Sequence, residues 1–130
     1  MSEQTEFDRF ATGLARRRET LGDDYVDRAE SNKNDFDAPY QQLITEAAWG
    51  HVWAREDISL RERSMIVLGI LAALGRWEEF ELHIRTTANT GATPEDIREV
   101  LLHVAIYGGV PAANSAMRIA KETLADMGKI

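Results

Sequence analysis

The feature that most constrains the fold of this chain is a ten-residue segment without a polar side chain, Met65–Leu74 (MIVLGILAAL). Ser59 and Glu62 precede it with the spacing of a helix capping box. Gly75 follows as a terminating residue, so the sequence predicts a helix over Ser64–Leu74. A helix that has no polar face must be buried on every side.

A second segment, Val100–Ile106, is also nearly all apolar. Two such helices carry more apolar surface than a helical domain of 130 residues can enclose, because most helices in a domain of that size touch solvent on one side. The surplus predicts an obligate homo-oligomer in which these helices are buried between subunits.

Most of the remaining chain shows the spacing of apolar residues that is typical of helices. Besides Ser64–Leu74, the predicted helices are Glu6–Leu21, Asp23–Ser31, Ala38–Trp53, Trp77–Thr90, a helix that starts after Thr93 and contains Val100–Ile106, and Val110–Met127. No segment has the pattern of a strand. The predicted fold class is therefore all-α with six to seven helices, and the length favours one domain over residues 1–130.

Several helix ends carry clear local signals. Gly22 and Gly91 follow predicted helices, where a left-handed residue often ends the last turn. Asp37 is predicted to cap the helix that starts at Ala38. Thr93 is predicted to cap the next-to-last helix, with Pro94 at its first position, where a missing N–H has no cost.

Charge and composition exclude several classes of function. The chain has 15 basic and 22 acidic residues, a formal net charge of -7, so neither nucleic acid nor an anionic membrane is an expected partner. It contains no cysteine, which excludes disulfides, thiolate ligands and thiol redox chemistry. No apolar run reaches the length of a membrane span, and the first ten residues do not have the pattern of a secretory signal, so we expect a cytoplasmic protein.

Two titratable pairs lie inside otherwise core-like helices. Glu79 and His83 stand four residues apart and so share one helical face, as do His103 and Tyr107. The first pair has the composition of an acid–base pair, in which the carboxylate orients the imidazole and raises its pKa. The alternatives are a solvated pair at Glu79 and His83, and a buried core histidine bonded to a carbonyl at His103.

The aromatic pair and the arginine cluster near the start of the apolar helix each allow two interpretations. Trp49 and Trp53 stand four residues apart and are more often core or interface than a substrate platform. Arg55, Arg61 and Arg63 form a cluster that could hold carboxylates through paired hydrogen bonds. The alternative is a surface charge cluster with the neighbouring acidic residues.

A metal site is not expected, although the chain has three histidines. His51, His83 and His103 do not form an HxxxH or HExxH motif.

Three segments resemble the carboxymuconolactone decarboxylase family, and the similarity covers nearly the whole chain. They are Phe36–Arg55 (FDAPYQQLITEAAWGHVWAR), Ser59–Arg85 (SLRERSMIVLGILAALGRWEEFELHIR) and Thr93–Asn114 (TPEDIREVLLHVAIYGGVPAAN). The resemblance implies an all-helical fold shared with alkylhydroperoxidase D and assembly as a homohexamer. The CxxC cysteines of that peroxidase would fall at Arg76 and Glu79, so the resemblance does not imply peroxide chemistry here.

The implied activity is the decarboxylation of 4-carboxymuconolactone to the β-ketoadipate enol-lactone during protocatechuate degradation, without a cofactor. On this resemblance we expect His83 to deliver the proton to the substrate, and we expect Glu79 to orient the His83 imidazole. Arg61 or Arg63 is expected to anchor a substrate carboxylate. The residues expected to line the pocket are Trp49, His103 and Tyr107.

Two other functions remain open at the level of the sequence. One is a related cofactor-free enzyme of the same scaffold that acts on another lactone or keto acid. The other is a helical oligomer that binds a small acid without chemistry.

Overall fold

The structure, a computed structural model, describes residues 8–130 and is helical over most of that range. Those residues form seven α-helices and one π-helix, without a strand, which confirms the predicted all-α class. Within the same range no helix is long and apolar enough to cross a membrane. The contacts divide the chain into two compact units, residues 1–58 and 59–130, which we describe separately; the single domain over 1–130 stays a prediction.

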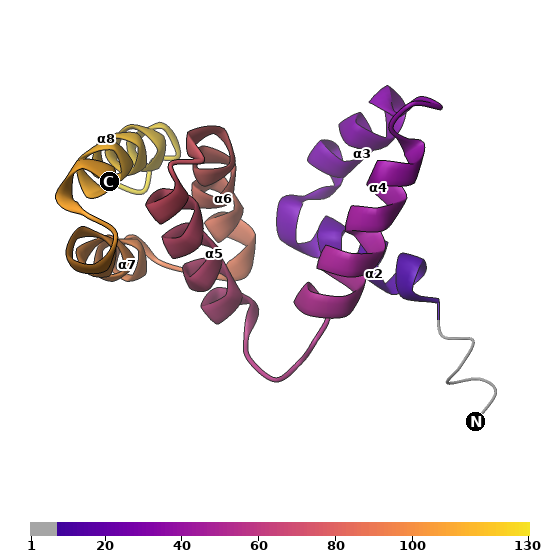
Figure 1. Ribbon diagram of the computed structural model, residues 1–130, viewed down its shortest axis with the longest axis horizontal. Helices are drawn as coiled ribbons and strands as arrows, with labels where there is room; N and C mark the ends of the chain where they lie inside the picture. The colour runs from indigo at the N-terminus through magenta and orange to yellow at the C-terminus, as the bar shows by residue number, and fades with distance from the viewer. Residues whose placement is uncertain (1–7) are drawn as a thin grey trace. The chain divides into compact units, whose positions relative to one another are not determined.

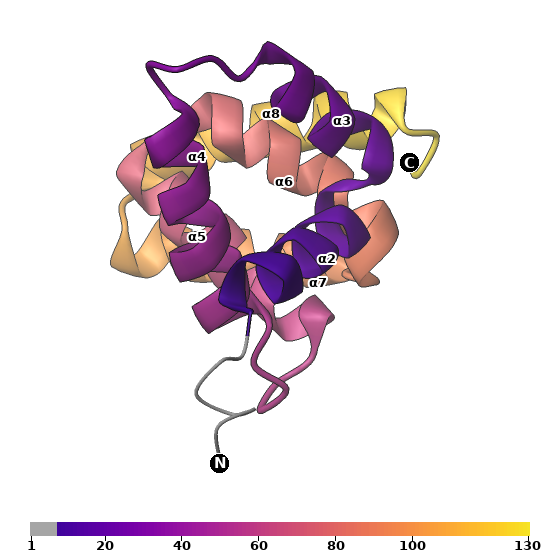
Figure 2. The same cartoon turned by 90° about the vertical axis from the view of Figure 1, so that its right-hand side faces the viewer.

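The first unit is built on the packing of α2 against the π-helix η1. Its elements are α2 (Arg9–Leu21), α3 (Asp23–Asn32), α4 (Ala38–Ile44) and η1 (Thr45–Trp53), and Figure 2 shows the turn from α2 into α3 and the loop from α3 to α4. The carboxylate of Asp8 caps α2 by accepting from the Ala11 amide at 2.9 Å. Residues 6 and 7, where that helix was predicted to start, lie outside the described range.

The helix predicted over Ala38–Trp53 is interrupted: α4 ends at Ile44 and the chain continues as a π-helix. The buried residues Thr45, Trp49 and Trp53 recur every four positions, a spacing that suits an α-helix and a π-helix alike. Local sequence therefore does not separate the two conformations.

Two glycines let α2 and η1 approach closely. A Cβ atom at Gly13 would overlap the carbonyl oxygen of Thr45 and lie 2.8 Å from the amide nitrogen of Gly50. A Cβ at Gly50 would overlap the carbonyl oxygen of Arg9. Neither position has room for any side chain, so backbone contact rather than side-chain packing sets this crossing.

The capping role predicted for Asp37 is wrong, although Pro39 does stand in the first turn of α4. Asp37 is in the helical region of backbone conformation and its side chain does not cap α4. Its carboxylate instead accepts from the amide of Asn34 at 2.9 Å, which closes the turn before the helix.

The second unit contains α5 (Leu60–Leu74), α6 (Trp77–Thr90), α7 (Pro94–Tyr107) and α8 (Val110–Asp126). Here α5 packs on the other three helices and α8 packs on α6 and α7 (Figure 1), whereas α6 and α7 make little direct contact. One apolar cluster joins the four helices; its buried members are Leu68, Ala72, Phe80, Ile84, Ile97, Leu101, Val104, Ala113, Ala116, Ala120 and Leu124.

The helix ends of this unit confirm the sequence predictions. Ser59 and Glu62 form a capping box at the start of α5. Thr93 and Asp96 form another at the start of α7, with Pro94 in its first turn. Gly91 ends α6 in the left-handed conformation, at φ 88°.

The two apolar helices are only partly covered by the other helices of the second unit. On α5, Ile66 and Ile70 remain 53% and 52% exposed, and on α7 Leu102 and Ile106 are also exposed. A groove of about 510 Å³ runs between these two helices. The chain thus carries an apolar face on α5 and α7 that its own core does not use.

Candidate functional site

Glu79 and His83 lie on one face of α6, beside its core-facing stripe. Trp77 starts the helix and packs edge-to-face on Phe80, with ring centroids 6.0 Å apart. Phe80 and Ile84 are fully buried, so they fix the rotation of α6 against the core. This rotation leaves His83 half-buried and Glu79, one turn earlier, exposed.

Burial decides the protonation state of His83. Desolvation lowers the pKa of His83 to about 4, and the negative charge of Glu79 raises it by a smaller amount. The net direction is opposite to the raised pKa that the pairing with Glu79 predicts. At pH 7 the imidazole is therefore neutral and carries one N–H donor.

His103 is exposed on α7 and not buried as the alternative reading expects, but it does bond to a carbonyl. Its Nδ1 lies 2.7 Å from the carbonyl oxygen of Glu99. A carbonyl only accepts, so Nδ1 carries the hydrogen and Nε2 offers a lone pair when the ring is neutral. Tyr107, one turn later, is 89% exposed.

His103 lines the groove between α5 and α7, whereas Glu79 and His83 do not. The lining residues of the groove are Met65, Ile66, Gly69, Ile70, Ala73, Glu99, Val100 and His103. Glu79 and His83 lie on α6, which makes little contact with α7. The two pairs that look equivalent in sequence thus occupy different places in this unit.

Arg61 is engaged in a structural ion pair. Its guanidinium donates two hydrogen bonds to the carboxylate of Asp96, at 2.7 and 2.6 Å. The same carboxylate accepts from the amide of Thr93 at 2.9 Å, and these donors hold the pKa of Asp96 well below its usual range. Arg61 therefore ties the start of α5 to the start of α7.

Arg63 is the buried cation of this unit, with 9% of its surface exposed. It lies in the first turns of α5, next to the fully buried Ser64. A guanidinium keeps its charge even when it is buried. Arg55, by contrast, pairs on the surface with Asp57 at 2.9 Å, as the charge-cluster alternative predicts.

Trp49 belongs to the first unit, where it is buried and stacks on Trp53. The ring centroids are 4.9 Å apart and the planes are inclined by 29°. Beside this pair, the guanidinium of Arg9 donates to Nδ1 of His51 at 2.7 Å. Trp49 is thus a buried residue of η1 whose ring stacks on Trp53.

Sequence reasoning missed the buried hydroxyls that accompany His83 on α6. Thr86 and Thr90 are buried and continue the face of Glu79 and His83 by helical spacing. Thr86 donates to the carbonyl of Leu82 at 2.9 Å. The available signal was the run of threonines after His83, which breaks the apolar pattern expected of a core helix.

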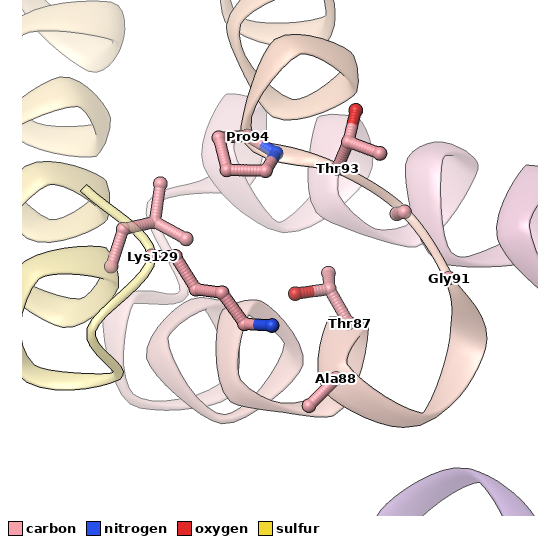
Figure 3. A pocket seen from close by; sticks show the side chains of 8 residues that line it. Thr87, Ala88, Gly91, Thr93, Pro94 and Lys129 are labelled. Atoms are coloured by element: carbon pink, nitrogen blue, oxygen red, sulfur yellow. The ribbon is translucent and has the colours of Figure 1, made fainter.

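A smaller cavity of about 200 Å³ lies at the turn from α6 to α7 (Figure 3). Figure 3 shows the Lys129 side chain extending toward Thr87 there. None of the predicted site residues lines this cavity. Within residues 8–130, no group of three His, Cys, Asp or Glu residues is arranged to hold a metal ion.

Comparison with known proteins places these features in a family. The sequence model of the carboxymuconolactone decarboxylase family matches residues 38–122, which span parts of both units. The 4-carboxymuconolactone decarboxylase of Acinetobacter baylyi is 40% identical over 120 residues, which cover 92% of this chain and 90% of that protein. The nitrosuccinic acid decarboxylase of Metarhizium robertsii is 41% identical over 118 residues, or 91% of this chain and 82% of that protein. The chain thus belongs to the carboxymuconolactone decarboxylase family.

Proposed function

We propose that this protein decarboxylates 4-carboxymuconolactone to the β-ketoadipate enol-lactone without a cofactor. The observation that carries the proposal is the similarity to a 4-carboxymuconolactone decarboxylase over 92% of the chain. The second relative, at 41% identity, acts on a different acid but is also named a decarboxylase. Loss of carbon dioxide is therefore the common chemistry.

The reaction makes one main demand on the site. The ring carbon of the lactone that loses carbon dioxide also carries an acetate arm. The electron pair that is released spreads through the ring double bond onto the lactone carbonyl oxygen. The ring carbon next to that carbonyl then takes up one proton. The site must therefore stabilise a negative oxygen while the electron pair is delocalised.

We assign this stabilising role to His83. Its imidazole is neutral at pH 7 because burial lowers its pKa to about 4, so its N–H is a ready donor to the developing oxyanion. Half-burial strengthens such a bond by reducing the competition from water. We assign this role in place of proton delivery. An imidazole with a pKa of about 4 is almost entirely neutral at pH 7, so very few molecules carry the second ring proton that a general acid would deliver. Glu79 is assigned the orienting role.

Arg63 is the better candidate for anchoring a substrate carboxylate. It is a buried cation of the unit that contains His83, whereas the Nε–Nη2 edge of the Arg61 guanidinium bonds to Asp96. Trp49, His103 and Tyr107 stay proposed substrate-binding residues, and within one chain the last two lie on α7, which makes little contact with α6.

The proposal includes assembly and cellular context. The exposed apolar face of α5 and α7 supports a homo-oligomer, and we propose the hexamer that the family resemblance implies. The proposed setting is the cytoplasm and the degradation of protocatechuate. Light scattering at micromolar concentration should report a hexamer, and a stable monomer would contradict the assembly.

The activity test uses purified protein, dialysed against a chelator, and 4-carboxymuconolactone as substrate. We expect turnover, and we expect His83→Ala to lower kcat by about 10²–10³-fold, the usual effect of removing one oxyanion donor. Glu79→Gln should cost less, since the imidazole remains. Glu78→Gln is the matched control, because Glu78 is a neighbouring exposed carboxylate in the same helical turn.

The outcomes separate the alternatives. Activity that is lost with the chelator and restored by zinc would contradict the cofactor-free reaction. A folded protein that binds the lactone without turnover would be the small-acid-binding oligomer. Near-full activity of His83→Ala would move the search to Arg63, His103 and Tyr107.

The pH profile tests the assigned state of His83. If the neutral imidazole is the working form, kcat/KM should stay flat between pH 6 and 8, about two or more units above the His83 pKa of about 4. A tenfold fall per pH unit over that range would instead show that the protonated imidazole is required.

A further inference from the structure

We infer that the substrate class of this protein is a succinate whose reacting carbon also carries an electron-accepting group, and that the protein decarboxylates nitrosuccinate as well as the lactone. The inference rests on the proposed function and extends it to a second activity at the same site. Its starting point is that two relatives named for different substrates are equally similar to the chain, at 40% and 41% identity.

The two substrates have the same frame around the bond that breaks. In 4-carboxymuconolactone, one carbon bears the departing carboxylate and a CH₂–COO⁻ arm, and the ring supplies the electron acceptor. In nitrosuccinate, one carbon bears the departing carboxylate and the same CH₂–COO⁻ arm, and a nitro group is the electron acceptor. Both are dianions, and both place the released electron pair on an oxygen atom.

The step on nitrosuccinate balances without a further reactant. The C–C bond to the departing carboxylate breaks and carbon dioxide leaves. The electron pair forms a C=N bond, and the negative charge moves to the nitro oxygens, which gives the nitronate of 3-nitropropanoate. One proton from water then adds to the carbon. Nothing is oxidised or reduced by an outside reagent, as in the lactone reaction.

The two residues proposed to bind the lactone would contact the groups that both substrates share, the anionic oxygen and the CH₂–COO⁻ arm, and not the ring. The neutral imidazole of His83 offers an N–H to an anionic oxygen, which lies three bonds from the reacting carbon in the enolate and two bonds from it in the nitronate. The buried guanidinium of Arg63 offers a fixed positive charge to the common CH₂–COO⁻ arm. Neither contact requires a ring.

What remains to separate the substrates is apolar contact with the lactone ring. Apolar contacts of about one or two carbon atoms discriminate by about 10–200-fold, whereas a lost polar contact costs far more. We therefore expect kcat/KM for nitrosuccinate to lie within about 10–200-fold of the value for the lactone.

The same reasoning predicts an inhibitor. The nitronate of 3-nitropropanoate is a planar dianion with its charge on oxygen, so it resembles the intermediate of both reactions. It should compete with the lactone and bind at least about 10²-fold more tightly than succinate, which has the arm and the carboxylates but no electron acceptor.

The experiment measures carbon dioxide release from both substrates, with the uncatalysed rate of each subtracted. Succinate is the negative control. His83→Ala should lower both activities by a similar factor, and Glu78→Gln should leave both unchanged. The nitronate should inhibit both reactions with the same inhibition constant.

Each outcome bears on a different claim. Turnover of both substrates with parallel loss in His83→Ala supports the inference. Turnover of the lactone alone overturns the inference and leaves the proposed function intact. Turnover of nitrosuccinate alone overturns both the proposed function and the two-substrate class, and inactivity toward both does the same. Nitrosuccinate turnover that survives in His83→Ala places that activity at another site and overturns the inference.

Discussion

Residues 59–130 bury eleven apolar side chains in one continuous cluster, whereas the described residues of the first unit bury three, Val26, Trp49 and Trp53. The first unit relies instead on the close approach of α2 and η1 at Gly13 and Gly50. The second unit is thus stabilised by the packing of buried side chains, and the first unit largely by close backbone contact between two helices. The difference predicts that the two units fail under opposite kinds of substitution, the second when a side chain is removed and the first when one is added.

Phe80→Ala should have the largest effect on stability. Phe80 is among the largest fully buried side chains, and truncating a buried phenylalanine typically costs about 3–5 kcal/mol. Urea unfolding would measure the change, and amide hydrogen exchange would show it in α5–α8. A loss below about 1 kcal/mol would mean that the apolar cluster is not what stabilises the second unit.

Acid should destabilise the second unit through His83. The pKa of His83 is about 4 in the folded protein and about 6.5 when unfolded, so the unfolded chain binds a proton that the folded chain does not. Stability is therefore fully present above pH 6.5 and falls as the pH drops toward 4, by about 3 kcal/mol over the whole window and by about 2 kcal/mol at pH 5.

Urea unfolding at pH 7 and pH 5 checks this linkage. His83→Gln has no titrating ring and should lose most of the pH dependence in that interval. If the free energy of unfolding changes equally with pH in the two proteins, His83 is not desolvated in solution.

Gly13→Ala should damage the first unit by adding a single methyl group. The new Cβ would overlap a carbonyl oxygen of η1 rather than a flexible side chain, so the backbone would have to move. Overpacking of this kind costs about 1–3 kcal/mol. Hydrogen exchange should quicken in α2 and η1, and unchanged protection there would contradict the role of backbone proximity.

Gly69→Ala is the counterpart in the second unit and should have the smallest effect, of opposite sign. A Cβ at Gly69 would lie 3.5 Å from Cγ1 of Val100, an ordinary contact. Replacing a mid-helix glycine with alanine then stabilises α5 by about 0.5–1 kcal/mol. A destabilisation as large as that of Gly13→Ala would remove the distinction between the two units.

The helix boundaries were largely predictable, because each is set by residues a few positions apart. The capping boxes at Ser59 and Thr93 and the terminating Gly91 need only neighbouring backbone groups. Asp37 was an exception, because its carboxylate bonds to the amide of Asn34 instead of capping α4. The apolar surplus of α5 and α7 was also readable from composition, and the other helices of the second unit leave it exposed.

The candidate site depended on packing that the sequence does not encode locally. Spacing places Arg61 among the candidate substrate anchors, but it does not reveal the ion pair with Asp96, 35 residues away. Glu79 with His83 and His103 with Tyr107 have the same spacing, yet α6 and α7 are separated in the second unit. Spacing places side chains on a helical face, but only the packing of helices decides which faces meet.

The sequence by itself determined the all-α class, most helix ends and the excess of apolar surface, since local hydrogen bonds and composition suffice for these. Only the tertiary structure decided the π-helix at Thr45–Trp53, the close α2–η1 crossing and the protonation state of His83. The reason is physical. A pKa follows the amount of water that surrounding elements displace, and a helix adapts its turn to what packs against it, so both depend on residues distant in the chain.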